Sequence, residues 1–194
     1  EESFFKNIDK ASFKEHLKKL TERPHVVGSE GNQEVIRYIG EVMKLAGMKV
    51  TNYSYDVYLP KNPGTSLIEI VTPYRDVLNQ KEDIIEDDPF TKDPELWKGW
   101  NAFSGSGDVT AEVVYANYGR KEDFETLKSL GIDVNGKIVI ARYGGNFRGY
   151  KAKFAEANGA SGLIIYTDPQ DSGFTKGLVY PYGPYYNSST IQRG

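Results

Sequence analysis

The chain has 194 residues, no cysteine, two histidines and a formal net charge of −3. The lack of cysteine excludes disulfides and thiolate metal sites, and the small net charge indicates no nucleic-acid partner. No apolar run approaches the roughly 18 residues of a membrane span, so none is predicted. Because the first residue is Glu1 and not Met, we expect a processed or excised piece of a longer protein.

Two helices are predicted near the N-terminus. Ser12 with Glu15 matches a capping box, which favours a short amphipathic helix over residues 10–21. Ser29 can cap a second helix, whose apolar positions recur at helical spacing until Gly47 ends it.

A β-hairpin is predicted after these helices. Apolar and polar residues alternate over residues 50–59, which is typical of a half-buried strand, and residues 67–71 are suited to an antiparallel partner. Two strands and two helices are a thin basis for a separate core, so we expect them to form one edge of a larger sheet.

An acidic, proline-containing stretch at residues 81–95 separates the two halves of the chain, and Trp97 and Trp100 follow it. This composition predicts a surface loop held down by tryptophan. A calcium site at residues 86–88 is not favoured, because adjacent acids lack the alternating spacing of a calcium loop.

The second half of the chain predicts a β-α-β-α-β core. Short β-branched runs alternate with helical apolar spacing, which favours parallel strands joined by helical crossovers. The predicted elements are a strand at 109–116, a helix at 122–130, a strand from 137, a helix with Phe147, Tyr150, Phe154 and Ala157 on its apolar face, and a strand at 163–166.

The glycine-rich turn from Gly144 to Gly149 allows two interpretations. Glycines before a helix can cradle a phosphate, and Asp168 lies near the position of a ribose-binding acid. The spacing is nevertheless Gly-Gly-x-x-x-Gly, and no second strand–helix pair follows. A tight structural turn is therefore favoured over nucleotide binding.

His16 and His25 are the only histidines, and neither lies in a zinc-binding spacing. His16 is predicted on a helix surface and His25 in a loop, where a structural hydrogen bond is the simpler role. No Ser–His–Asp or Cys–His set can be assembled, so no catalytic residue is assigned and the chain alone is not expected to catalyse hydrolysis.

Several segments together resemble a known family. They are Arg23–His25, Ala102–Ser104, Val114–Tyr118, Arg120–Phe124, Gly136–Tyr143, Phe147–Gly149 and Tyr166–Pro169. They resemble the glutamate carboxypeptidase and transferrin-receptor-like zinc peptidase family and its protease-associated (PA) domain. The resemblance implies a mixed α/β chain, with the edge of a peptidase domain at residues 1–72 and an incomplete PA domain at residues 73–194.

The resemblance also implies a function. The parent protein is expected to be a two-zinc exopeptidase whose metal ligands and general base follow Gly194, with the PA domain roofing the active site. Its partners would be a peptide substrate, the remainder of the peptidase domain and a second subunit, in an extracytoplasmic location. A receptor-like relative without peptidase activity and a free-standing PA interaction module are the alternatives.

The resemblance assigns one substrate-binding residue, Arg120. It implies contact between this arginine and the C-terminal carboxylate of the substrate, whereas the residues alone favour a surface arginine paired with Glu122 or Asp123. The neighbours Gly119 and Lys121 leave a preference for terminal glutamate open.

Overall fold

The computed structural model describes residues 2–192, which divide between Ala102 and Phe103 into two compact units. Residues 73–102 group with the earlier residues and not with the later parallel strands. The expected start of the PA domain at residue 73 stays a prediction.

The first unit begins with three helices, α1 (Glu2–Lys6), α2 (Lys10–Thr21) and α3 (Glu30–Leu45). The two predicted helices are confirmed, and Ser29 caps α3 through a 3.1 Å bond from the Asn32 backbone N–H. The predicted capping box at Ser12 is wrong. Asp9 precedes the helix, and its carboxylate accepts hydrogen bonds from the backbone N–H groups of Ala11 and Ser12. None of the helices within residues 2–192 is long and apolar enough to cross a membrane.

The predicted hairpin is also wrong. Residues 50–59 form no strand, and the side chains of residues 51–59 are exposed, Tyr53 to 77%. The second predicted strand shrinks to β1 (Glu69–Ile70), which pairs with β2 (Asp76–Val77) in an antiparallel ladder. Alternation creates a strand only where a neighbouring backbone accepts its hydrogen bonds, and residues 2–192 offer none to residues 50–59.

The acidic, proline-containing stretch at residues 81–95 forms no strand. It contains the short 3-10 helix η1 (Pro89–Lys92), which is capped by the Asp88 carboxylate. Trp97 and Trp100 contact each other edge-on, with ring centroids 5.9 Å apart.

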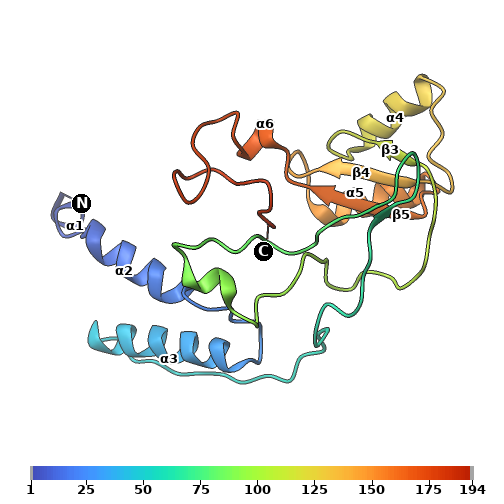
Figure 1. Cartoon of the computed structure of the whole chain (residues 1–194). Coiled ribbons are helices and arrows are strands. Elements are labelled where there is room, and N and C mark those ends of the chain that lie inside the picture. Colours follow the sequence, from blue (N-terminus) through green and yellow to red (C-terminus); the bar gives the residue numbers. More distant parts are fainter. Residues whose placement is uncertain (1, 193–194) are drawn as a thin grey trace. The chain divides into compact units, whose positions relative to one another are not determined.

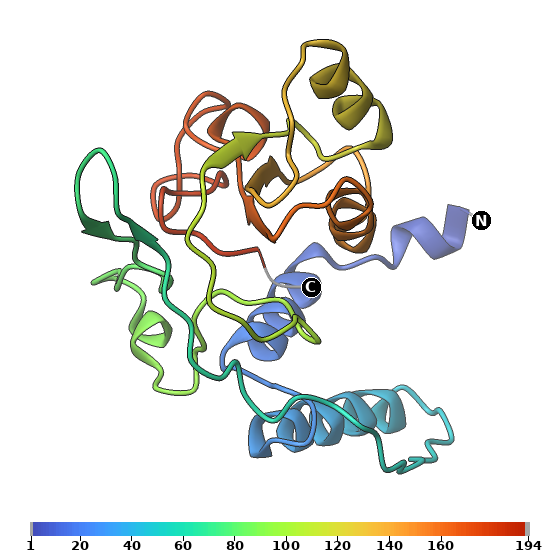
Figure 2. The same cartoon turned by 90° about the vertical axis from the view of Figure 1, so that its right-hand side faces the viewer.

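The second unit has the predicted β-α-β-α-β order (Figures 1 and 2). Its elements are β3 (Val113–Tyr115), α4 (Lys121–Ser129), β4 (Ile138–Arg142), α5 (Arg148–Ala157), β5 (Gly162–Tyr166) and α6 (Pro169–Ser172). The strands are parallel in the order β3-β4-β5, with Ile140 opposite Tyr115 on one side and Ile164 on the other. The predicted parallel sheet is therefore confirmed.

The core of this unit lies between the sheet and two helices. Val139 is fully buried at the centre of β4, and Phe124 of α4 and Ala155 of α5 pack into the same cluster. Figure 2 shows both helices on the same side of the strands. Because all three strands run the same way, the loops that follow them meet at one edge of the sheet.

The face of α5 that packs inward differs from the prediction. Phe147, expected on the apolar face, is 78% exposed, and Tyr150 is exposed as well. Lys151 and Ala155 are the residues of α5 that are buried. Lys151 can be buried because its ammonium group donates hydrogen bonds to two backbone carbonyl oxygens, those of Tyr118 and Gly144.

Candidate functional site at the carboxyl edge of the parallel sheet

Polar side chains gather where the three parallel strands end. Residues 117–120 follow β3, residues 143–147 follow β4, and Asp168 follows β5. In open sheets of parallel strands, ligands bind outside this edge. The contacts described below join the three loops to one another.

Arg120, the predicted substrate-binding residue, lies at this edge. It precedes α4, and its backbone N–H donates to Asp123 Oδ2 at 2.8 Å. Its side chain is exposed, and its Nε donates to the carbonyl oxygen of Gly145 at 3.1 Å. The two terminal nitrogens have no hydrogen-bond partner within residues 2–192, and no carboxylate of that part lies within 4 Å of the guanidinium. The expected alternative, ion pairing with Glu122 or Asp123, is therefore not what the structure contains.

The glycine-rich turn explains how Arg120 is held. Gly144 and Gly145 have φ angles of +87° and +76°, which favour glycine. A Cβ atom on Gly145 would lie 2.7 Å from Nε and Nη2 of Arg120 and 2.8 Å from Cγ of Tyr118. The missing side chain thus lets the β4–α5 turn approach Arg120 closely. The turn that the sequence predicts as structural therefore contacts the side chain of Arg120.

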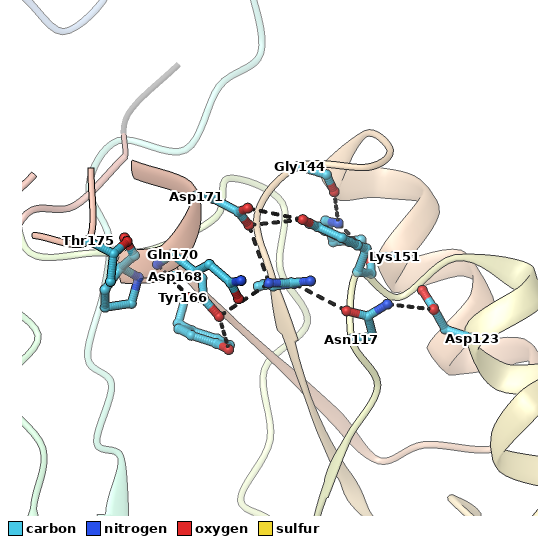
Figure 3. Close-up of polar contacts among 12 residues, drawn as sticks. Asn117, Asp123, Gly144, Lys151, Tyr166, Asp168, Gln170, Asp171 and Thr175 are labelled. Carbon is cyan, nitrogen blue, oxygen red and sulfur yellow. Dashed lines mark hydrogen bonds and ion pairs between the residues drawn. The ribbon is translucent and has the colours of Figure 1, made fainter. Parts of the chain in front are cut away.

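A second arginine, Arg142 at the end of β4, has three polar side-chain partners. Its Nη1 lies 3.6 Å from both Asp168 Oδ2 and Asp171 Oδ2. Its Nε donates to Asn117 Oδ1 at 3.1 Å, and Asn117 Nδ2 donates onward to Asp123 Oδ1 at 2.9 Å (Figure 3). Arg142 therefore links the loops after β3 and β5, in contrast to the free terminal nitrogens of Arg120.

Asp168 has a structural role instead of the ribose contact considered for it. Its carboxylate accepts hydrogen bonds from the Gln170 backbone N–H and from the Tyr166 hydroxyl, both at 2.8 Å. These bonds, the Gln170 bond first, and nearby Arg142 lower the pKa of Asp168 below its usual value. Asp168 also caps α6, so its charge is committed within the fold.

Sequence reasoning missed Lys151. Its side chain has no exposed surface, and its Nζ donates to the carbonyl oxygens of Tyr118 at 2.5 Å and Gly144 at 2.7 Å. Burial lowers the pKa of this ammonium group. Lys151 lies one turn before Ala155 on the buried side of α5, but apolar spacing alone does not mark that side of the helix.

The described residues do not fit a zinc centre. His16 Nδ1 lies 2.6 Å from the Tyr38 hydroxyl, and His25 Nδ1 lies 3.0 Å from the Arg23 carbonyl oxygen. Within residues 2–192, no three histidine, cysteine, aspartate or glutamate side chains gather in a way that could hold a metal ion. Catalytic zinc sites need three such ligands, and structural zinc sites need four.

Comparison with known proteins agrees with this topology. Residues 109–191 match the family model for the PA domain. A probable glutamate carboxypeptidase of Arthroderma benhamiae is 40% identical over 176 residues, which cover 88% of this chain and 24% of that protein. The chain therefore carries a PA domain and is similar over most of its length to a protein named as a probable glutamate carboxypeptidase.

Two further relatives have the same coverage pattern. The glutamate carboxypeptidase 2 homolog of Caenorhabditis elegans is 35% identical, over 97% of this chain and 26% of its own length. The mouse aminopeptidase NAALADL1 is 28% identical over all of this chain and 27% of its own length. The chain therefore spans about a quarter of the length of the curated relatives that it matches.

Proposed function

We propose that this chain is the N-terminal part of a zinc exopeptidase of the glutamate carboxypeptidase type, and that its PA domain helps to bind the C-terminal residue of a peptide substrate. The names of the relatives support the peptidase class. The geometry of Arg120 supports the substrate contact. Arg120 grips the terminal carboxylate in this proposal, and the remainder of the pocket comes from the peptidase domain.

The free terminal nitrogens of Arg120 are the observation that carries the proposal. A guanidinium group offers donors in a planar fork that matches the two oxygens of a carboxylate. The Nε of Arg120 is fixed on the Gly145 carbonyl oxygen, which leaves Nη1 and Nη2 for a ligand. The nearby carboxylates are committed elsewhere, Asp123 to the Arg120 backbone and Asn117, and Asp168 and Asp171 to Arg142.

Hydrolysis itself is not assigned to this chain, because its described residues do not fit a zinc centre. In the proposal, a peptidase domain supplies the ligands of two zinc ions and the general base. Bound zinc would activate water and polarise the peptide carbonyl. The family resemblance also supports a homodimer in an extracytoplasmic location.

Kinetics with paired substrates test the proposal. The protein that carries this chain with its complete peptidase domain would be measured on peptides with a free C-terminal carboxylate and on the same peptides as C-terminal amides. Losing one charge-assisted contact is worth roughly 1.5–3 kcal/mol, so Arg120→Ala should lower kcat/KM on the free acids about ten- to a hundredfold. The amides should change little. Arg120→Lys should recover only part of the loss, because an ammonium group is a point charge.

Lys121→Ala is the matched control, because it removes one exposed positive charge from the next position. Among residues 2–192, Lys121 pairs only with Glu125, across the surface of α4, at 3.5 Å. The control should leave the preference for free acids unchanged, and Arg120→Ala should keep the free energy of unfolding within about 0.5 kcal/mol of wild type. Equal losses on acids and amides, or none on either, would return Arg120 to a surface role. A protein that hydrolyses neither substrate would favour the receptor-like or PA-module alternatives.

A further inference from the structure

The aromatic ring of Tyr118 lies against two guanidinium groups. The Cζ atom of Arg142 is 4.0 Å from the ring centroid, and the Cζ atom of Arg120 is 5.0 Å from it. Both distances fall within the roughly 6 Å at which a cation is attracted to the face of an aromatic ring. Arg142 is held by two carboxylates, whereas Arg120 ends in free nitrogens. The ring therefore connects a fixed cation with the proposed ligand-binding cation.

Tyr118 is itself held at both ends. Its hydroxyl donates to Asp171, whose two carboxylate oxygens are each 3.1 Å away, and its backbone carbonyl accepts from Lys151. Asp171 belongs to α6, 53 positions further along the chain. Hydrogen bonds from opposite ends of one residue restrict how far the ring can swing. A ring fixed in this way can restrict the group that rests on it.

The compensation of the Arg142 charge also favours this arrangement. Two guanidinium groups near one ring would repel each other if both carried uncompensated charge. Asp168 and Asp171 face Arg142, so that cation is compensated inside the cluster. Arg120 then meets the ring face without a strong opposing field from Arg142.

We propose that Tyr118 is a positioning residue that fixes the direction of the Arg120 guanidinium, so that its terminal nitrogens face an incoming carboxylate. The proposal rests on the substrate role proposed for Arg120. Tyr118 does not touch the substrate in it. Two contacts hold the guanidinium group of Arg120. The face of the Tyr118 ring lies against it, and the Gly145 carbonyl oxygen accepts a hydrogen bond from its Nε.

The test is a double-mutant cycle read through the acid-to-amide ratio of kcat/KM in the complete enzyme. An exposed cation–π contact corresponds to about a two- to fivefold effect, so Tyr118→Leu should lower the ratio by that factor. Tyr118→Phe keeps the ring and loses the bond to Asp171, so it should lower the ratio less. In an Arg120→Ala background, Tyr118→Leu should have no further effect on the ratio. Tyr150→Leu removes an exposed aromatic ring from α5 and should leave the ratio unchanged.

Two outcomes would overturn the proposal. A Tyr118→Leu loss that is equal on acids and amides, and that persists without Arg120, would mark a purely structural role. If Arg120→Ala itself leaves the ratio unchanged, the substrate role fails, and the positioning role is decided by NMR on the 194-residue chain. There, Tyr118→Leu should speed the solvent exchange of the Arg120 Nε–H proton, while Tyr150→Leu should not. An unchanged exchange rate would refute the positioning role.

Discussion

The ammonium nitrogen of Lys151 lies 2.5 Å from the backbone carbonyl oxygen of Tyr118. The same nitrogen donates to the carbonyl oxygen of Gly144 at 2.7 Å. Tyr118 follows β3 and Gly144 follows β4, so one side chain of α5 ties together the two loops that hold Arg120. Figure 3 shows Lys151 beside Gly144 in this network.

This arrangement explains how a charged residue can occupy the buried face of a helix. An unpaired polar group in an apolar environment is costly, and a charge costs more. Within residues 2–192, no carboxylate lies within 4 Å of the Lys151 ammonium group, and two carbonyl dipoles compensate its charge instead. The lowered pKa of Lys151 agrees with incomplete compensation, because burial is its main cause.

The first prediction is that Lys151→Met destabilises the fold by roughly 1–3 kcal/mol, because two loop carbonyl groups lose their shared donor. Methionine keeps the length of the side chain, so the cavity contribution should be small. Urea unfolding of the chain measures the change. Lys153→Met is the matched control, since Lys153 is exposed on the same helix, and it should stay within about 0.5 kcal/mol of wild type. Equal stabilities for the two variants would contradict a clamping role for Lys151.

The arrangement of elements in the second unit was predictable because each element carries a local signal. β-branched runs between glycines mark β4 and β5, and helical spacing marks α4 and α5. The inward face of α5 was not predictable from apolar spacing alone. Apolar spacing treats every lysine as exposed, and only the carbonyl groups of two other loops make Lys151 an interior residue.

The candidate site was predictable in part. The resemblance assigned Arg120, but its neighbours come from separate segments of the chain. Tyr118 and Asp171 are 53 positions apart, and Arg120 meets Gly145 25 positions away. Contacts over such separations depend on the register of the sheet, which no local pattern contains. The wrong prediction of a strand at residues 50–59 has the same cause. A β-ladder needs a second strand, and the alternation of apolar and polar residues within one segment does not identify that strand.

The second prediction concerns acid stability. The pKa of Asp168 is lowered from its ordinary value of 3.8 by the Gln170 backbone bond, the Tyr166 hydroxyl and Arg142. The fold therefore favours the ionised form, and its stabilisation is complete above about pH 4 and is lost as the pH falls through the lower pKa of the folded state. Asp168→Asn should lose about 1–2 kcal/mol at neutral pH, and this difference from wild type should shrink below pH 4.

Urea unfolding of both proteins between pH 2.5 and 7, at intervals of about half a unit, measures this difference. Glu125→Gln serves as control, because in the part of the chain that the structure describes Glu125 pairs only with Lys121, on an exposed helix surface. Its difference from wild type should stay near zero throughout. An Asp168→Asn difference that is constant down to the acid limit would exclude the ionised carboxylate as its source.

The third prediction is that the chain alone binds no structural zinc. Its two histidines are engaged with Tyr38 and the Arg23 carbonyl, and the residues from 2 to 192 bring no third ligand to either. Calorimetric titration of the chain with zinc should give only weak, non-stoichiometric heats. One equivalent bound with sub-micromolar affinity would contradict this prediction, and loss of that binding in His16→Ala or His25→Ala would identify the ligand.

The last prediction is that Gly145→Ala displaces the Arg120 side chain although Arg120 itself is not substituted. A Cβ atom there would lie 2.7 Å from Arg120 Nε, closer than real contacts allow, and the φ angle of +76° already disfavours alanine. The guanidinium or the turn must therefore shift. Strain at such a position is of order 1–3 kcal/mol, so the free energy of unfolding should fall by about that amount.

Gly149→Ala is the matched control for this prediction. Gly149 lies in the first turn of α5, and a Cβ atom added there would meet no atom within 4 Å. In a helix, alanine is favoured over glycine, so this variant should be as stable as wild type or up to about 1 kcal/mol more stable. In the complete enzyme, Gly145→Ala should lower kcat/KM on free-acid peptides while Gly149→Ala should not. If the two alanine variants unfold and hydrolyse alike, the close approach of the glycine turn to Arg120 has no functional consequence.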